Sequence, residues 1–277
     1  MKFTERYVHT GNIAMNVAEW SAPSPDALPM TMVLVHGYGS NWHTWGRVTD
    51  KFAQDFHLYA VDLRGMGRSG RFGKGSRRQT WADDVARLIG MLVDRPVLLI
   101  GHSLGGWITA AVAAQRPELV SKAVLVEPYS GVHSEVRRRE RVRRQEHRER
   151  RAGLIRSAIT PADLVPSVRE KYSEASDDSV ERIARMWFEL DPVLETDLNS
   201  SSDDAESFDE MFSSIQCPTL IIRGAVERGG ILSDEEADRL AGLIPDSRAL
   251  YWPRIGHSPH IARNHDFIRA VKRFHAE

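Results

Sequence analysis

Residues 97–106 have the sequence VLLIGHSLGG, and this stretch decides the fold. An apolar run typical of a buried strand ends in Gly101-His102-Ser103-Leu104-Gly105, and an alanine-rich helical pattern follows. We therefore expect a strand, a sharp turn and a helix, with Ser103 at the apex of the turn. A glycine on each side lets the two backbones approach closely, which lifts the Ser103 hydroxyl above the sheet beside the positive end of the helix.

The composition limits the class of protein. A chain of 277 residues fits one large domain or a domain with an insertion, and its formal charge of -1 gives no reason to expect a nucleic acid or an anionic membrane as partner. The single cysteine, Cys217, excludes an intramolecular disulfide. No stretch has metal-ligand spacing, the character of a secretion signal or membrane-spanning length. We expect no metal, no cofactor, a small-molecule substrate and a cytoplasmic location.

Strand and helix patterns alternate along most of the chain. Continuous apolar runs such as 30–35 and 219–224 are typical of strands buried on both faces, and helical patterns separate them. Together with a hairpin-like opening over residues 3–20, they predict a mostly parallel, doubly wound α/β sheet with helices on both faces. The alternation stops between Pro128 and Cys217, where the sequence is charged and helical. We expect a core of residues 1–127 and 217–277, with an inserted helical cap over residues 128–216.

The predicted cap divides by charge. Residues 135–151 contain nine arginines against four glutamates, whereas residues 174–210 are rich in aspartate and glutamate. One interpretation is that both are solvated helix faces that pair across the cap. The other is a basic rim that draws an anionic substrate toward the pocket. The sequence favours the first for most of these side chains and singles out no arginine for the second. A polar run at 199–204 predicts a mobile loop.

A serine hydroxyl is a poor nucleophile near neutral pH and needs a base to accept its proton. Among the eleven histidines, His257 is the best candidate for that base, because it follows the last predicted strand in a Gly-His loop. His36 and His102 flank backbone turns and are expected to orient loops. His260 has no positional argument and is expected at the surface or in a local hydrogen bond.

Two carboxylates are candidates for the group that orients the histidine. Glu127 ends the strand after the serine helix, and Glu227 lies in the loop after the following strand; both keep the chain order serine, acid, histidine. Glu227 is followed by Arg228, which neutralises it, and by glycines that indicate a mobile loop. Glu127 lies in the stiffer backbone, between Val126 and Pro128. We prefer Glu127, because orientation is the main task of the acid.

Acyl transfer also requires donors for the developing oxyanion. The amide of Leu104, at the expected start of the helix, supplies one. The loop after the first buried strand, residues 36–39, should supply the other, and we choose the amide of Tyr38. The glycine-rich segment 62–70 lacks the Gly-Lys-Ser/Thr of a phosphate loop and is interpreted as a structural turn.

These motifs together resemble those of the α/β-hydrolase superfamily over nearly the full chain: His36-Gly37-Tyr38-Gly39, Asp62-Leu63-Arg64-Gly65, Gly101-His102-Ser103-Leu104-Gly105 and Gly256-His257. Many members carry the acid after the strand that here ends in Gly224, and a smaller set carries it at the position of Glu127. Residues 125–128 and 228–231 are similar to amide hydrolases of the N-formylmaleamate deformylase type. Those enzymes have aspartate at the position of Glu127, and the extra methylene changes the reach to His257.

The sequence thus predicts a serine hydrolase that cleaves a small amide or ester through an acyl-enzyme, with Ser103, Glu127 and His257 as its triad. The resemblance implies a deformylase or amidase of heteroaromatic catabolism. Two alternatives stay open. The same fold serves carbon–carbon bond hydrolases of ring-cleavage products and cofactor-free oxygenases, and it also serves ligand-binding receptors, in which turnover is incidental.

Overall fold

The computed structural model describes residues 2–21, 30–73, 77–131, 135–196 and 205–277, although the side chains of 135–144 and 205–207 are not described. Six of the nine arginines counted in residues 135–151, those of residues 137–144, therefore have no described side chain. The run expected to form a mobile loop, 199–204, lies outside the described residues altogether.

One eight-stranded sheet forms the centre of the molecule, in the order β1-β2-β4-β3-β5-β6-β7-β8. The strands from β3 to β8 pair with one another in parallel, whereas the pairs β1–β2 and β2–β4 are antiparallel. The predicted mostly parallel sheet and the opening hairpin are therefore confirmed. The strand bounds are β1 Thr4–His9, β2 Ala14–Trp20, β3 Thr31–Val35, β4 His57–Val61, β5 Val97–His102, β6 Val120–Val126, β7 Thr219–Gly224 and β8 Ser247–Trp252.

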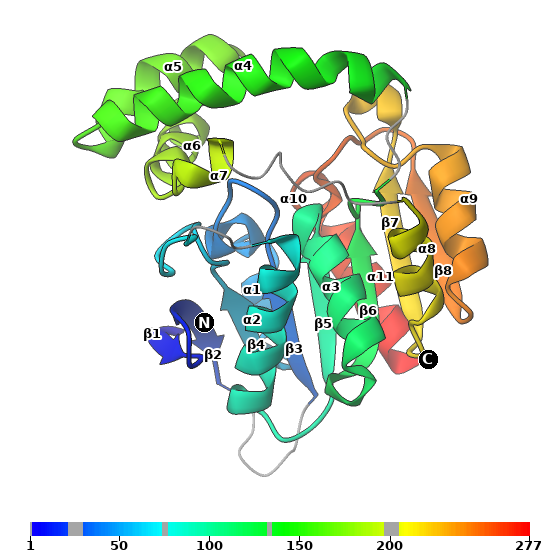
Figure 1. Cartoon of the computed structure of the whole chain (residues 1–277). Coiled ribbons are helices and arrows are strands. Elements are labelled where there is room, and N and C mark those ends of the chain that lie inside the picture. The colour runs from blue at the N-terminus through cyan, green and yellow to red at the C-terminus, as the bar shows by residue number, and fades with distance from the viewer. Residues whose placement is uncertain (1, 22–29, 74–76, 132–134, 197–204) are drawn as a thin grey trace.

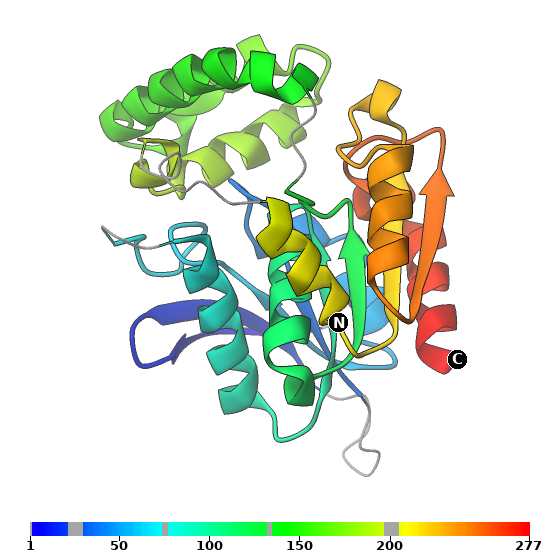
Figure 2. The same cartoon turned by 45° about the vertical axis from the view of Figure 1, so that its right-hand side comes forward.

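Helices cover both faces of the sheet (Figures 1 and 2). One face carries α2 (Arg78–Leu92), α3 (Leu104–Gln115), α8 (Ala205–Ser213) and α9 (Asp234–Leu243), and the other carries α1 (Thr49–Phe52) and α11 (Asn264–Ala276). Shorter elements connect them: η1 (Trp42–Trp45), η2 (Pro117–Leu119), η5 (Val226–Arg228) and α10 (Pro259–Ala262).

The continuous apolar strands supply two cores at once. In β3, Val33 and Val35 pack into the core beneath α2 and α3, whereas Met32 and Leu34 pack into the core beneath α1 and α11. Successive side chains of a strand point to opposite faces, so a strand covered on both sides must be apolar at every position. This requirement explains why the sequence shows apolar runs here and no polar–apolar alternation.

Residues 128–216, called here the inserted segment, lie between the end of β6 at Val126 and the start of β7 at Thr219. Its helices α4 (Glu135–Ser157), α5 (Val165–Lys171), α6 (Asp177–Phe188) and α7 (Val193–Thr196), with η3 (Pro161–Leu164), lie across the carboxyl ends of the strands (Figure 1). Leu164, Val168, Val180, Ala184 and Trp187 form a small core within it. The last helix of the segment, α8, instead packs against α3. The division into a core and a cap remains a proposal.

Candidate active site

Ser103 lies at the junction of β5 and α3, in a backbone conformation that side-chain-bearing residues rarely adopt. Its φ is 55° and its ψ is -113°. A Cβ on Gly101 would lie 1.9 Å from the Gly105 carbonyl oxygen, and one on Gly105 would lie 2.2 Å from the carbonyl oxygen of Val35. Only glycine fits at both positions, so the two glycines permit the turn that presents a half-buried Ser103 at the strand ends.

Glu127 follows β6 directly and lies beside the serine turn. The Ser103 amide donates to the carbonyl oxygen of Val126 at 2.9 Å, which ties the turn to the strand that ends at Glu127. The Glu127 side chain has no exposed surface. Its Oε1 accepts a hydrogen bond from the Gly224 amide at 2.6 Å, and its Oε2 accepts one from the Ile231 amide at 2.5 Å. Two main-chain donors therefore fix the carboxylate in one orientation.

His257 approaches this carboxylate from the loop after β8. Its Nδ1 lies 3.3 Å from Glu127 Oε2, and because an ionised carboxylate only accepts, Nδ1 carries the proton. Nε2 is then the basic nitrogen. The loop reaches this place because Gly224 has no side chain: a Cβ there would lie 2.3 Å from the carbonyl oxygen of Gly256. The other candidate acid, Glu227, is exposed in η5.

Ser103 and His257 are neighbours through His102. His102 Nε2 lies 2.7 Å from the carbonyl oxygen of His257, and the two rings have centroids 4.6 Å apart. Within the described residues Ser103 makes no hydrogen bond to the His257 ring. Such bonds are often long without substrate and tighten when it binds. The structure thus pairs Glu127 with His257. Ser103 follows His102, whose ring contacts His257.

The loop of Tyr38 lies against the serine. A Cβ on Gly37 would lie 3.2 Å from Ser103 Cβ, so the loop after β3 packs directly on the turn. The Leu104 amide is the first of α3. Neither the Tyr38 amide nor the Leu104 amide donates a hydrogen bond within the part of the chain that the structure describes. Both are therefore available to an incoming oxygen atom, as an oxyanion hole requires.

Three buried histidines lie near these groups. His36 accepts a hydrogen bond from the Leu63 amide at Nε2, and burial lowers its pKa. Burial and the neighbouring rings of His260 and His257 hold the pKa of His102 well below its usual value. Burial also lowers the pKa of His260 to about 3. The expected surface or hydrogen-bonded place for His260 is wrong: it is 1% exposed, and neither ring nitrogen has a partner among the described residues.

The side chain of Tyr38 leads away from the serine toward the inserted segment. Its hydroxyl lies 2.7 Å from Glu195 Oε1 and 2.9 Å from the carbonyl oxygen of Leu194. Arg151 Nη2 lies 2.6 Å from the same Glu195 oxygen. Burial and the adjacent carboxylate raise the pKa of Tyr38, so its hydroxyl stays protonated and donates. Sequence analysis did not predict this set, because no local motif marks Glu195.

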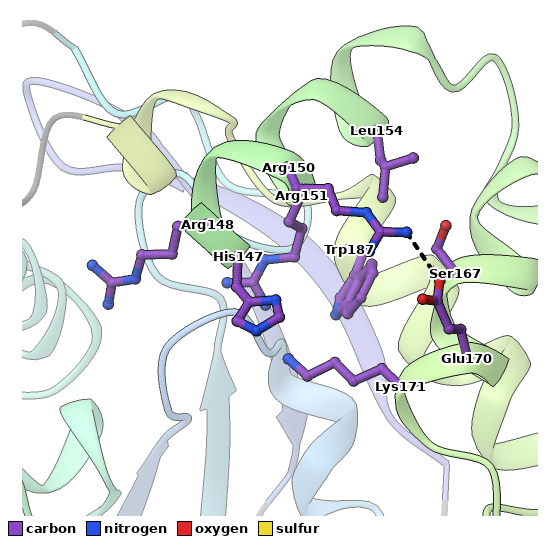
Figure 3. Close-up of a pocket in the computed structure, with 9 residues that line it drawn as sticks. All are labelled: His147, Arg148, Arg150, Arg151, Leu154, Ser167, Glu170, Lys171 and Trp187. Carbon is purple, nitrogen blue, oxygen red and sulfur yellow. Dashed lines mark hydrogen bonds and ion pairs between the residues drawn. The ribbon is translucent and has the colours of Figure 1, made fainter. Parts of the chain in front are cut away.

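A cavity of about 480 Å³ lies between α4, α5 and α6 (Figure 3). Three arginines and a lysine face it, against one carboxylate, Glu170, which pairs with Arg150 at 3.0 Å. The cavity is therefore positively charged. Its lining residues are His147, Arg148, Arg150, Arg151, Leu154, Ser167, Glu170, Lys171 and Trp187. No group of three or more metal-ligating side chains occurs among the described residues.

Comparison with known proteins agrees with this geometry. A model of the alpha/beta hydrolase family matches residues 32–270. The chain belongs to this family. A Haemophilus influenzae protein named as an esterase/lipase is 25% identical over 251 residues, covering 88% of this chain and 82% of the other. The 2-(acetamidomethylene)succinate hydrolase of Mesorhizobium japonicum is 35% identical over 130 residues, 46% of this chain and 44% of that enzyme. The predicted family is confirmed, and the chain is a hydrolase.

Solved structures show the same fold over the whole chain. The structure of an E-2-(acetamidomethylene)succinate hydrolase has a TM-score of 0.74 at 21% identity and covers 100% of both chains. The thioesterase domain from the curacin biosynthetic pathway has a TM-score of 0.75 at 20% identity, covering 98% of this chain and 99% of that one. At these identities the likeness concerns the fold alone. No helix in the described residues is long and apolar enough to span a membrane.

Proposed function

We propose that this hydrolase is a serine amidase or esterase that works through an acyl-enzyme. Ser103 Oγ attacks the carbonyl carbon while His257 Nε2 takes its proton, and the carbonyl oxygen becomes an oxyanion held by the Tyr38 and Leu104 amides. His257 then protonates the leaving nitrogen or oxygen as its bond to carbon breaks. Water repeats the sequence on the acyl-enzyme, releasing the acid and restoring Ser103.

The observation that carries this proposal is the contact between Glu127 and His257. A buried carboxylate held by two main-chain amides keeps the proton on His257 Nδ1 and stabilises the imidazolium that forms during attack. An orienting acid, an imidazole and a strained serine turn at one edge of a parallel sheet form the arrangement that activates a serine. An unstrained turn would suffice for a protein that only binds a ligand.

The cavity indicates the kind of substrate. Arg148 and Lys171 give it positive charge, whereas Arg150 and Arg151 are paired with Glu170 and Glu195; Arg148 also lies over the ring of Tyr38, with 5.4 Å between guanidinium and ring centroid. We propose that the inserted segment acts as a cap and holds an anionic group of the substrate. The names of two relatives, both succinate hydrolases, support an anionic amide as the substrate. A deformylase or amidase of heteroaromatic catabolism agrees with the charge of the cavity and with these relatives.

The first experiment measures product release from a panel of N-formyl and N-acyl amides, anionic and neutral, beside short-chain esters. N-formylmaleamate is the first anionic member, and its formate and amine products are assayed separately. We expect the anionic amides to give the highest kcat/KM. Oxygen uptake, or turnover of a dienoate from ring cleavage without amide hydrolysis, would instead favour the carbon–carbon hydrolase or oxygenase alternatives.

The Ser103→Ala variant tests the mechanism itself. Without the hydroxyl no acyl-enzyme can form, so kcat should fall by about 10⁴-fold or more while the variant stays folded. The measurements are kcat on the best member of the panel and the far-UV circular dichroism spectrum. Hydrolysis at more than about a tenth of the wild-type rate would show that Ser103 is not the nucleophile.

A further inference from the structure

Glu195, in the short helix α7, is a buried carboxylate that the proposed chemistry does not use. Its side chain has no exposed surface. Oε1 accepts hydrogen bonds from the Tyr38 hydroxyl and the Arg151 guanidinium, whereas Oε2 has no hydrogen-bond partner within the described residues. A buried carboxylate is costly unless it is paired, and this one is only half satisfied.

Its contact with Tyr38 bears on the oxyanion hole. Tyr38 lies between Gly37 and Gly39, and Gly39 has a φ of 69°. Glycines on both sides give this turn unusual backbone freedom. An amide that is to stabilise an oxyanion must nevertheless be held within a few tenths of an ångström of its working position. The anchored Tyr38 side chain supplies part of that restraint, because its hydroxyl is fixed at the far end by Glu195.

The contact with Arg151 leads into the inserted segment. Arg151 belongs to α4, lines the cavity and lies over Trp187, with its guanidinium carbon 5.3 Å from the ring centroid. A continuous set of contacts, Tyr38–Glu195–Arg151, therefore joins the loop of residues 36–39 to the cavity proposed for the anionic part of the substrate. Figure 3 shows Arg151 at the cavity.

We propose that Glu195 is a positioning residue, which fixes the Tyr38 amide for oxyanion stabilisation and links it to Arg151 of the inserted segment. Glu195 touches no reacting atom and acts through the Tyr38 hydroxyl. The inference rests on the proposed function, since it assumes acylation of Ser103. It requires that loss of Glu195 slow the formation of any oxyanion at Ser103, including with a neutral reagent that makes no use of the cavity charge.

A double-mutant cycle with Tyr38→Phe and Glu195→Met tests it. The reaction is phosphonylation of Ser103 by a neutral p-nitrophenyl phosphonate ester: the Oγ–P bond forms, p-nitrophenolate leaves and His257 takes the serine proton. The amplitude of p-nitrophenolate release gives the number of reactive sites, and the rate of release measures how well the oxyanion is stabilised. We expect full amplitude and a rate lowered about 10- to 100-fold in each variant. The double variant should be no slower than Tyr38→Phe alone, because that substitution already removes the contact with Glu195, along with the bond to the Leu194 carbonyl oxygen.

Two further variants separate positioning from folding. Glu195→Gln keeps an acceptor for the Tyr38 hydroxyl and should recover part of the rate lost in Glu195→Met. Arg182→Met, which breaks an exposed pair with Asp178 in α6, is the control and should react at the wild-type rate. If Glu195→Met does not fold, Glu195→Gln takes its place in the cycle: its rate should lie between those of wild type and Tyr38→Phe, and adding it to Tyr38→Phe should slow the reaction no further.

Two results would overturn the inference while leaving the proposed function standing. One is a wild-type rate in Tyr38→Phe and in Glu195→Met, with only a lower melting temperature. The other is additive losses in the double variant. Failure of the wild-type enzyme to be labelled at Ser103 is a distinct result, which overturns the proposed function and the inference with it.

Discussion

Glu127 and Glu227 differ in burial and in contacts. The Glu127 carboxylate accepts two main-chain hydrogen bonds and contacts His257, whereas Glu227 is exposed. In Glu127→Gln an amide –NH₂ replaces one acceptor and faces an N–H donor, and the charge that stabilises the imidazolium is lost. We expect kcat to fall by about 10³- to 10⁴-fold, by analogy with other triad acids. Steady-state kinetics on the best member of the amide panel measures it.

The matched control is Glu227→Gln, which removes the same charge at an exposed position. It should leave kcat within about twofold of wild type. Circular dichroism spectra and melting temperatures of both variants show whether a loss of rate reflects unfolding. A crippled Glu227→Gln beside an active Glu127→Gln would assign the acid to the loop after β7.

Sequence reasoning at this scale finds residues that have a local signature. Ser103, Glu127 and His257 each follow a strand or a glycine turn, so their positions could be predicted, although their chemical roles remain a proposal. Glu195 has no such signature, because its partners Tyr38 and Arg151 lie 157 and 44 positions away in the chain. His260 was misplaced for the same reason: its burial arises from contact with Trp45, a distant aromatic residue.

At the scale of elements, the strands and the helical character of residues 128–216 were predictable, but the packing partners of the inserted helices were not. Apolar runs fix where buried strands lie, because a strand covered on both faces excludes polar residues. Charged helices carry no comparable constraint, since surface ion pairs contribute little energy and specify few partners. Of the pairs expected between residues 135–151 and 174–210, Arg151–Glu195 forms, although Glu195 is buried and not solvated, whereas Arg150 pairs with Glu170, outside the acidic stretch. The cavity that these helices enclose required the structure.

Lys171, at the end of α5, tests the proposed role of this cavity. Its ammonium lies 5.6 Å from the Trp187 ring centroid and forms no ion pair among the described residues, so it is available to an anion. We expect Lys171→Met to raise KM for anionic amides about tenfold, the equivalent of one charged contact, with kcat little changed. KM for a neutral short-chain ester should stay the same.

Arg182→Met is the control here too, because Arg182 lies outside the cavity and its pair with Asp178 is exposed. It removes a positive charge from the same group of helices, so it reports any general effect of charge on association. Equal increases of KM for anionic and neutral substrates in Lys171→Met would show that Lys171 does not recognise an anion.

For the whole molecule, the carboxyl ends of the strands combine a strained turn with buried ionisable groups. Burial lowers the pKa values of His36, His102 and His260. Unfolding exposes these rings to water, where their pKa values return to about 6.5. Below that pH the unfolded chain therefore binds protons that the folded chain does not, and the free energy of unfolding must decrease as the pH falls. The stability that neutral burial provides is fully present only above about pH 6.5.

His260 isolates one part of this dependence, because its ring contacts Trp45 and Phe267 without a hydrogen bond among the described residues. In His260→Phe one proton fewer is taken up on unfolding. Between about pH 7.5 and about pH 5.5, the wild-type free energy of unfolding should therefore fall by about 1.4 kcal/mol more than that of the variant. Urea unfolding at the two pH values measures the difference, and subtraction cancels the contributions of groups that do not contact His260. Identical pH dependence in the two proteins would mean that His260 has the same pKa in the folded and the unfolded chain, and its lowered pKa would then be wrong.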